Sequence, residues 1–323
     1  MTPGRRAESL EELWRPVARP PGRNTPAQWI RFTPEEAKAR LSRLAARTPE
    51  VMVKITGRKR GQDHVRAHLE YISRHGALPL EGRDGELLES PGDLFERAAA
   101  WAADDRRPRK DSATCISFVL SMPPGTPAIG VRDAARAFAS EVFADRHDYL
   151  FALHTDADHP HVHLTVKVRG RGGDRLNPRK GDLCIWRSAF ARHLRDHSID
   201  AEATHRRARG VCERPERFEL RKLRERHERD PSRHAPPRVW STNTVSAEEL
   251  SDWRHSSDLQ RHETRRIYGR AAEMLIRSAD PTDVALGRRL SEFVERLAQA
   301  QARFVGNETR LSLRQTFYEL RKT

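Results

Sequence analysis

A block of histidines that runs directly into an alternating strand is the feature that most constrains this chain. The stretch HTDADHPHVHLTVKV, residues 154–168, holds four of the fifteen histidines within its first ten residues. From residue 161 onward polar and apolar side chains alternate, which predicts a strand with one polar and one apolar face. The polar face carries His161, His163, Thr165 and Lys167. Two imidazoles on one side of an otherwise apolar strand indicate a site on that side.

A hairpin brings a third histidine to the same place. The stretch HDYLFALHT, residues 147–155, also predicts a strand, and the short acidic turn DADH joins it to the histidine strand. Strands joined by so short a turn pair antiparallel, so His154 lies close to His161 and His163. Three imidazoles can hold one cation and leave positions open for a substrate. The alternative is a hairpin with surface histidines only, and His159, beside Pro160, is out of register with the other three.

Two carboxylates lie in the turn of this hairpin. Asp156 and Asp158 could hydrogen-bond a ligating imidazole and fix its tautomer, or they could cap the backbone of the turn, as Asp often does. We keep both residues as candidate catalytic side chains, because a carboxylate beside a metal site can also accept a proton.

The charge of the chain indicates an anionic partner. Sixty Lys and Arg stand against forty-six Asp and Glu, a formal net charge of +14, and a strongly basic protein is typical of nucleic-acid binding. The alternative is a soluble protein that is merely rich in arginine. Three cysteines without a paired spacing indicate a reducing compartment, and the sequence has neither an apolar run of membrane-spanning length nor a secretory leader. We therefore expect a cytoplasmic protein that does not insert into a membrane.

The order of predicted elements indicates an α+β fold. Strands are predicted at 50–56, 113–122, 147–155 and 159–170, and helices at 34–46, 62–75, 91–103, 131–144 and 183–197. Strands mixed with helices, including an adjacent antiparallel pair, favour an antiparallel sheet flanked by helices. We divide the chain into a basic arm with a helix (1–49), a nuclease domain (50–204), a charged linker (205–246) and a helical region (247–323), in which Leu286, Leu290, Phe293 and Leu297 are spaced for one buried face.

A candidate nucleophile lies in the helix predicted over residues 62–75. Tyr71 is one of four tyrosines, and it is surrounded by cations that could grip phosphate. These are Arg58, Lys59, Arg60, Arg66 and Arg74. The alternative is that Tyr71 is a packing residue of an amphipathic helix.

Three blocks of the sequence together resemble a known family. They are VKITGRKRGQDHVRAHLEYISRHG, HTDADHPHVHLTV and RLNPRKGDLCIWRSAFARHLRDHSIDAEATHRRARG. In this order they are similar to the relaxases of conjugative and mobilisable plasmids, within the HUH endonucleases and in the branch that includes the T-DNA border endonuclease. The resemblance covers about Val51 to Gly210. As in relaxases, the tyrosine precedes the histidines; unlike many of them, this chain has about fifty residues before the nuclease fold.

The resemblance implies a fold, a site and a reaction. The fold is a sheet of about five antiparallel strands flanked by helices; His154, His161 and His163 hold a divalent metal ion, and Tyr71 is the nucleophile. We expect Mn or Mg as the native metal, with Zn, Co or Ni as alternatives, although imidazole by itself suits the transition metals better than Mg. The reaction is a strand-specific nick in single-stranded DNA at an origin of transfer, through a reversible 5′-phosphotyrosyl intermediate.

The same resemblance implies partners, and two other functions remain open. The partners are single-stranded DNA, relaxosome accessory proteins and a type IV secretion coupling protein. The arginine-rich stretches, with Arg179 and Lys180 in the second, are expected to bind DNA phosphates. One alternative is a metal-dependent nuclease or phosphoesterase in which water attacks, and the other is a DNA-binding accessory protein without catalysis. A two-histidine phosphoesterase needs a second H-x-T motif beside His163, Leu164 and Thr165, and the sequence has none.

Overall fold

The structure is a computed structural model of the 323-residue chain. It describes residues 33–104, 112–209 and 247–299, together with Ser9, Leu10, Trp14, Leu223, 226–230, 232 and 233. The chain divides into two compact units, Pro16–Thr204 and a second one made of Met1–Arg15 with His205–Thr323.

The sheet of the Pro16–Thr204 unit confirms the α+β class. Its strands are β1 (Met52–Lys59), β2 (Leu80–Gly82), β3 (Leu87–Leu88), β4 (Cys115–Ser121), β5 (Tyr149–His154) and β6 (His161–Lys167). They pair antiparallel in the order β1-β4-β6-β5-β2-β3. The sheet has six strands rather than about five, because the sequence between 80 and 88 forms a short hairpin, β2–β3, that we did not predict.

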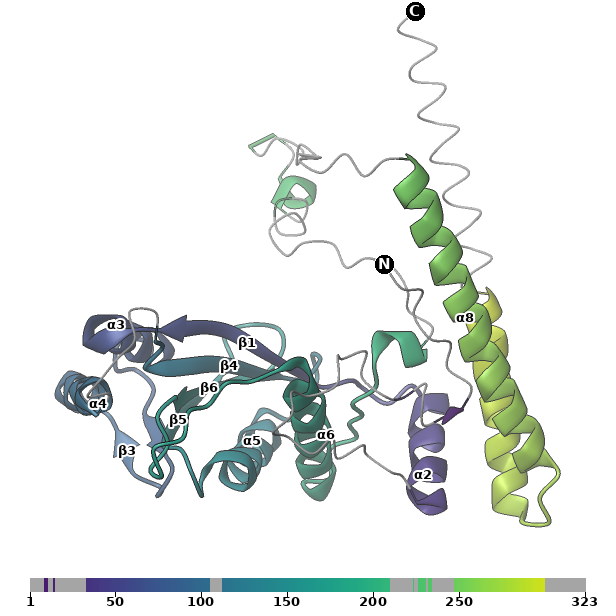
Figure 1. Ribbon diagram of the computed structural model, residues 1–323, viewed down its shortest axis with the longest axis horizontal. Helices are drawn as coiled ribbons and strands as arrows, with labels where there is room; N and C mark the ends of the chain where they lie inside the picture. Colours follow the sequence, from purple (N-terminus) through teal and green to yellow (C-terminus); the bar gives the residue numbers. More distant parts are fainter. Residues whose placement is uncertain are drawn as a thin grey trace, which may run out of the picture. The chain divides into compact units, whose positions relative to one another are not determined.

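Helices cover both faces of this sheet (Figure 1). On one face α5 (Ala128–Phe143) and α6 (Lys180–Asp196) pack against the apolar side chains of β4 and β6, among them Phe118, Val162 and Leu164. On the other face α3 (Gly61–Ile72) and α4 (Pro91–Ala103) pack against Leu150 and Ala152 of β5. The apolar side chains of β6 therefore face α5 and α6, and its histidines face the side that carries α3, as the alternation of the sequence requires.

The helix α2 (Pro34–Ala45) lies in the same compact unit as the sheet. It begins as predicted, with the Thr33 hydroxyl accepting a hydrogen bond from the Glu36 amide and Pro34 in the first turn. Arg43 of α2 donates to the Glu202 carboxylate at 2.7 Å, and Glu202 pairs with Glu50 just before β1. Our sequence boundary placed this helix in an arm ending at residue 49.

Two elements around the tyrosine differ from the prediction. The strand predicted to end at residue 56 continues to Lys59, into the stretch GRKRG, with a register shift between Ile55 and Gly57. The helix predicted to reach residue 75 ends at Ile72, because Arg74 and His75 adopt positive φ angles of 54° and 58°. A left-handed backbone cannot continue a right-handed helix.

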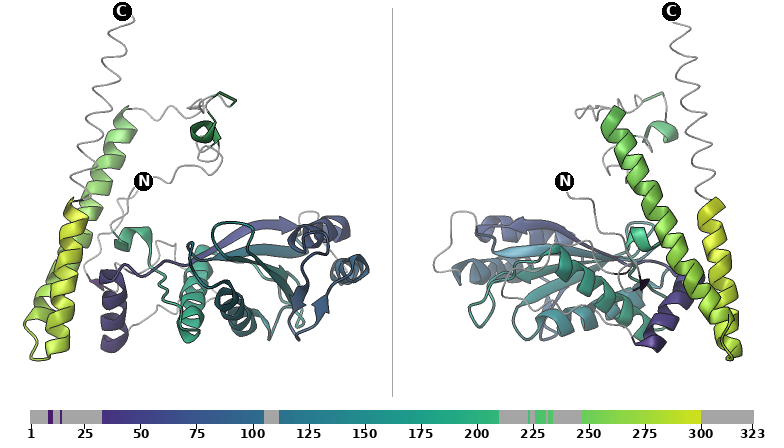
Figure 2. Two further views of the ribbon diagram at one scale, coloured as in Figure 1. Left: turned by 180° about the vertical axis from the view of Figure 1, so that it is seen from behind. Right: turned by 45° about the vertical axis from the view of Figure 1, so that its right-hand side comes forward.

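The second unit is mainly helical where it is described. Helix α8 (Ala247–Ile276) is followed by a helix over 281–299, and the two run side by side in both views of Figure 2. Leu286, Leu290 and Phe293 are buried as their spacing predicted, with Phe293 against Tyr268 at 5.8 Å between ring centroids, whereas Leu297 is only partly buried. Most of the predicted linker, 205–246, lies outside the described residues. Among the described residues no helix is long and apolar enough to cross a membrane.

Candidate metal centre and nucleophile

The three predicted ligand histidines converge at one end of the β5–β6 hairpin. In the register of the hairpin His154 lies opposite His161, and Ala152 lies opposite His163. One ring nitrogen from each histidine lies within 4.8 Å of those of the other two. The ring centroids of His154 and His163 are 4.4 Å apart, and those of His161 and His163 are 5.2 Å apart. Imidazoles at this spacing can ligate one ion after small side-chain rotations.

His163 has the protonation state and the free ring nitrogen that a metal ligand needs. Burial, followed by the neighbouring His154 and His161, lowers its pKa to about 3. Its Nδ1 atom is buried and has no hydrogen-bond partner, which is unusual because buried polar atoms are nearly always paired. A neutral imidazole with an unpaired buried nitrogen fits a metal ion, which binds only the deprotonated ring.

The tautomer of His154 follows from its two neighbours. Its Nε2 lies 2.7 Å from the Ile72 carbonyl oxygen, and its Nδ1 lies 3.0 Å from Nη2 of Arg74. A guanidinium has donors only, so Nδ1 accepts from Arg74 and the protonated Nε2 donates to Ile72. Burial is the main cause that lowers the pKa of His154. The nitrogen left to a metal ion is therefore Nδ1.

His161 presents its other nitrogen to the cluster. Its Nδ1 lies 3.2 Å from the His159 carbonyl oxygen, and donation to this oxygen leaves Nε2 with its lone pair. His159 itself is not one of the three converging residues, in line with its position out of register. Backbone carbonyls thus orient two of the three imidazoles, as is usual around metal-binding histidines.

Tyr71 lies at the end of α3 beside the histidines. Its ring meets that of His163 edge to face with 6.0 Å between centroids, and its side chain is 52% exposed. The Arg74 guanidinium carbon lies 5.4 Å from the Tyr71 ring centroid. A packing tyrosine would be covered, so the exposure of this ring favours a role at the surface of the site.

Arg74 also joins one of the two turn carboxylates to the cluster. It forms an ion pair with Asp156, and the same nitrogen contacts His154. Asp158 is exposed at the tip of the same turn. Of the two candidate carboxylates, Asp156 is the one that a described side chain ties to the histidines.

The structure adds one residue that the sequence analysis missed. His68 is buried between α3 and the sheet, with Nε2 at 2.8 Å from the Ser117 hydroxyl and 2.9 Å from the Thr165 hydroxyl. Burial, followed by the charge of Lys59, lowers its pKa to about 4. The available signal was its place on the buried stripe of the helix, between Val65 and Ile72.

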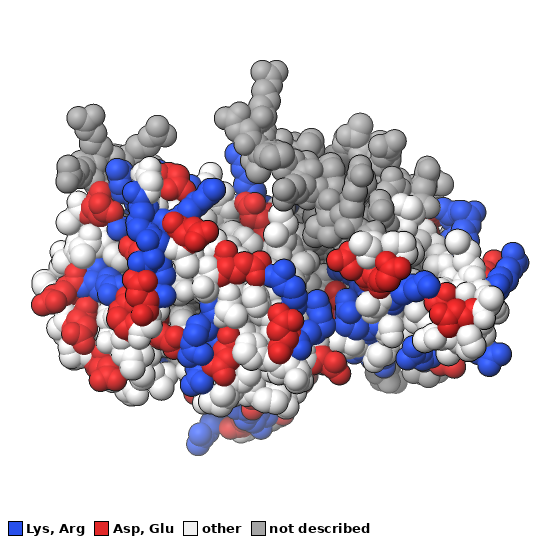
Figure 3. Space-filling view, turned by 90° about the horizontal axis from the view of Figure 1, so that it is seen from below, with Lys and Arg blue, Asp and Glu red and all other residues white. Residues whose placement is uncertain are grey.

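The predicted DNA-binding residues are not all near the histidines. Lys59 pairs with Cys115, which pairs with Lys167, so Arg58, Lys59 and Arg60 lie at the opposite end of the sheet from His161. Exposed side chains are those of Arg58, Arg60, Arg66, Arg179 and Lys180. On the face shown in Figure 3 basic and acidic side chains of the described residues are interspersed and form no single basic patch.

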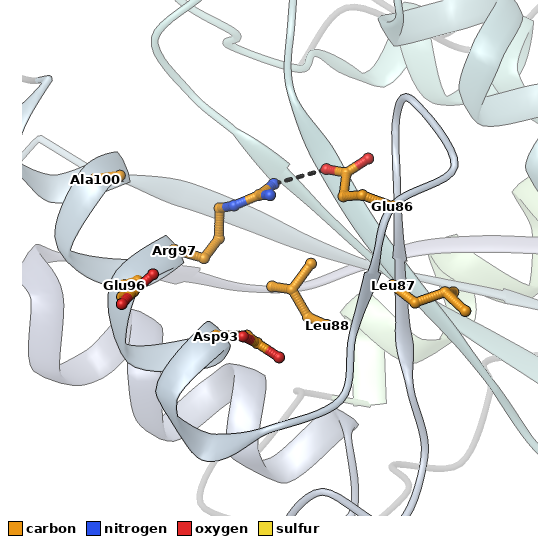
Figure 4. Close-up of a pocket in the computed structure, with 7 residues that line it drawn as sticks. All are labelled: Glu86, Leu87, Leu88, Asp93, Glu96, Arg97 and Ala100. Atoms are coloured by element: carbon orange, nitrogen blue, oxygen red, sulfur yellow. Dashed lines mark hydrogen bonds and ion pairs between the residues drawn. The ribbon is translucent and has the colours of Figure 1, made fainter.

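A cavity of about 380 Å³ lies apart from this site, between α4 and the β2–β3 hairpin (Figure 4). Arg97 reaches across it to Glu86 at 3.0 Å, and the other lining residues are Leu87, Leu88, Asp93, Glu96 and Ala100. It shares no residue with the histidine cluster, so we do not assign the chemistry to it.

Comparison with known proteins identifies the relatives of this region. Residues 84–199 match the family model described as "Relaxase: MobA/VirD2-like, nuclease domain". The chain is 34% identical over 169 residues to the T-DNA border endonuclease VirD2 of Rhizobium radiobacter, and 31% identical over 166 residues to that of Agrobacterium fabrum. Each match covers 46% of this chain and 39% or 37% of the relative, so the similarity spans about two fifths of the relatives' length.

These matches confirm the resemblance to relaxases that the motifs indicated. The stretch 84–199 includes the three histidines and both turn carboxylates, and it begins after Tyr71. A solved structure titled "Molecular Basis of Vancomycin Resistance Transfer in Staphylococcus aureus" aligns with 49% of this chain and 99% of that chain, with a TM-score of 0.32 and 12% identity. A likeness at that level carries no conclusion about this chain.

Proposed function

We propose that this protein is a DNA relaxase that nicks and rejoins single-stranded DNA at an origin of transfer. The observation that carries the proposal is the placement of the exposed Tyr71 ring edge-on to His163, which is one of three converging imidazoles. The match of residues 84–199 to the relaxase nuclease domain supports it independently.

The reaction is a transesterification by Tyr71. The phenolate oxygen attacks the scissile phosphorus, the bond from phosphorus to the 3′ oxygen breaks, and that oxygen leaves with a proton as a free 3′-hydroxyl. The 5′ phosphate is then bound to Tyr71 by a phosphodiester link, so the 3′-hydroxyl can attack in reverse and reseal the strand. No energy source is needed, because one phosphodiester is exchanged for another.

His154, His161 and His163 would hold a divalent ion. When bound, such an ion withdraws charge from a non-bridging phosphate oxygen as negative charge develops there. The imidazoles must stay neutral for this, and burial keeps the pKa of His163 far below neutral pH. Mn and Mg remain our expected ions, with Zn, Co or Ni as alternatives.

A carboxylate is the proposed acceptor of the Tyr71 proton. The phenol must lose its proton as its oxygen attacks phosphorus, so a proton acceptor beside Tyr71 assists the step. Asp156 is our first candidate because Arg74 contacts both its carboxylate and the Tyr71 ring. Asp158 and His159, in the same turn, are the second candidates.

The basic residues are proposed to bind the DNA backbone on both sides of the nick. Arg66 and Arg74 lie on or just after α3, near Tyr71. Arg58, Lys59 and Arg60 lie at the other end of the sheet, displaced from His163 by four residues or about 13 Å along the strands and by two strands across the sheet. They would hold phosphates a few nucleotides away from the scissile one, as would Arg179 and Lys180. Accessory proteins, a coupling protein and a cytoplasmic location are part of the same proposal.

The test is a denaturing gel of the protein incubated with Mn²⁺ and labelled single-stranded oligonucleotides that tile an origin of transfer. We expect a slow covalent protein–DNA band that is absent in Tyr71→Phe and present in the matched helix variant His64→Ala. Cleavage without an adduct, unchanged in Tyr71→Phe, would mean that water attacks. Binding without any cleavage would mean a non-catalytic accessory protein.

A further inference from the structure

The chain directly after the tyrosine helix has an unusual backbone. Arg74, His75 and Gly76 follow one another with φ angles of 54°, 58° and 89°. A left-handed residue other than glycine costs about 1–2 kcal/mol, and such residues persist where the surroundings hold them and often where function needs them. Here the consequence is that the Arg74 side chain turns back toward the hairpin.

The guanidinium of Arg74 contacts three functional residues. Nη2 lies 3.0 Å from Nδ1 of His154 and pairs with Asp156, and the guanidinium carbon lies 5.4 Å from the Tyr71 ring centroid. The side chain is one-third exposed, at 33%. It is thus held by the site and is still accessible to a ligand that enters from solvent.

The contact with His154 uses the nitrogen that a metal ion needs. The Nε2 proton of His154 points at the Ile72 carbonyl oxygen, so Nδ1 alone carries a lone pair. An ion bound to imidazole lies about 2.0–2.1 Å from the nitrogen along that lone pair. An Arg74 N–H that donates to the same lone pair occupies this direction, and a guanidinium also repels a second cation nearby.

We propose that Arg74 and the divalent ion compete for Nδ1 of His154, and that a DNA phosphate relieves the competition by drawing Arg74 away. Guanidinium binds phosphate oxygens through two parallel hydrogen bonds, and the partly exposed Arg74 guanidinium lies against the ring of Tyr71, the proposed nucleophile. Metal and DNA then favour each other's binding, and by linkage each raises the affinity for the other by the same factor. This second half rests on the proposed function, whereas the competition itself needs only the metal site.

The competition is tested on the full chain without DNA, with Co²⁺ as the probe and its visible absorption bands as the readout. We expect Arg74→Gln to bind Co²⁺ about tenfold more tightly than the wild type, the effect of one hydrogen bond to a charged group. The matched control is Arg192→Gln, which removes the same charge from an exposed arginine on α6, on the other face of the sheet. An affinity that is equal or lower in Arg74→Gln, with the control at the wild-type value, would overturn the competition.

Asp156 is the main source of ambiguity, because a carboxylate freed from Arg74 could itself become a metal ligand. The double variant Arg74→Gln with Asp156→Asn removes this possibility. If Co²⁺ still binds more tightly than to Asp156→Asn alone, the competition stands; if the gain disappears, Asp156 and not Arg74 controls the site. Thermal unfolding and circular dichroism of each variant identify any loss of fold. Arg74→Lys, which keeps the positive charge but lacks the planar guanidinium, should give an intermediate Co²⁺ affinity.

The coupling to DNA is tested by repeating the titration with a saturating single-stranded oligonucleotide on the Tyr71→Phe background. The increase in Co²⁺ affinity caused by DNA should be at least severalfold larger with Arg74 than with Gln at this position. An equal increase would show that the phosphate acts on the ion directly and would overturn the coupling. If His163→Ala binds Co²⁺ as well as the wild type, the histidines are not the metal site, and both the proposed function and this inference fail; if only the Arg74 variants fail, the proposed function stands.

Discussion

The two halves of strand β6 carry the same alternation of side chains, but their polar side chains differ in burial and in hydrogen bonding. His161 and His163 are partly exposed, and Nδ1 of His163 has no partner. Thr165 and Lys167 lie on the same face and are buried. Thr165 is hydrogen-bonded to His68, and Lys167 forms an ion pair with Asp104 at 2.6 Å.

The difference teaches how a site can be recognised on a uniform strand. Polar side chains at the covered end satisfy one another, and they hold α3 and the C-terminal end of α4 against the sheet. At the other end the imidazoles leave hydrogen-bonding capacity unused, which is costly in a buried position unless a ligand takes it up. The comparison predicts that substitutions at the histidine end affect binding and chemistry, and that those at the covered end affect stability.

The largest effect of a substitution is expected at the histidine end of β6. His163→Ala should lose metal binding and slow DNA cleavage by at least about a hundredfold, the size of effect seen when one group that stabilises transition-state charge is removed. Metal titration and single-turnover cleavage measure the two losses. His64→Ala, on the exposed side of α3, is the matched control. Cleavage at the wild-type rate by His163→Ala would remove the basis of the comparison.

At the covered end we expect a dependence of stability on pH. The pKa of His68 is lowered from 6.5 to about 4. Between pH 4 and pH 6.5, His68 is therefore protonated in the unfolded chain and neutral in the folded protein. The stability contributed by neutral His68 is fully present above pH 6.5 and is lost as the pH falls toward 4, by on the order of 3 kcal/mol. Chemical denaturation at several pH values should show a weaker pH dependence in His68→Gln, which keeps a hydrogen-bonding amide but does not titrate. An unchanged dependence would mean that other buried histidines cause the acid sensitivity.

Much of the histidine end could be predicted from the sequence, because its geometry depends on residues that are close together in the chain. A period of two and a short turn suffice to place His154 opposite His161, and both features lie within fifteen residues. The assignment of Tyr71 needed the family resemblance, since a single tyrosine in a helix has no distinctive spacing. The structure places its ring beside His163, although their positions differ by ninety-two residues in the sequence.

The roles of Arg74 and His68 could not be predicted because they depend on long-range contacts. Arg74 reaches His154 only because the helix ends early in a left-handed turn, and no glycine occupies that position to indicate it. The basic stretch 58–60 was expected near Tyr71 because it is close in sequence. A helix of twelve residues is about 18 Å long, however, so α3 carries Tyr71 to the other end of the sheet.

The distance between these basic residues and the histidines predicts that their substitution has a smaller, salt-dependent effect on DNA binding. Arg58→Gln and Arg179→Gln should each weaken single-stranded DNA binding severalfold. Each should also reduce the slope of log K against log salt concentration by about one, because one fewer counterion is released. The affinity for Mn²⁺ in the absence of DNA should not change, since Arg58 lies at the opposite end of the sheet from His161 and Arg179 precedes α6, which packs on the sheet face opposite to the imidazoles. Fluorescence anisotropy at several salt concentrations measures both quantities. A slope equal to that of the wild type would show that DNA does not reach this end of the sheet.

The smallest effect concerns the strained turn that follows the tyrosine helix. His75 is exposed, has a φ of 58°, and donates its backbone N–H to the Glu70 carbonyl oxygen at 2.8 Å. Glycine adopts this backbone without the steric cost of a Cβ atom but loses more entropy on folding, so His75→Gly should raise the free energy of unfolding by up to about 1 kcal/mol. The reverse change at the next residue, Gly76→Ala, should lower it, because φ at Gly76 is 89°.

Denaturant unfolding of both variants separates two explanations of this turn. If His75→Gly is more stable and Gly76→Ala less stable, the left-handed backbone of this turn costs stability at His75 and needs glycine at residue 76. If His75→Gly is destabilised by more than the entropy cost of glycine, the His75 side chain itself holds the turn. The histidine end would then owe part of its geometry to a contact outside the cluster of three histidines.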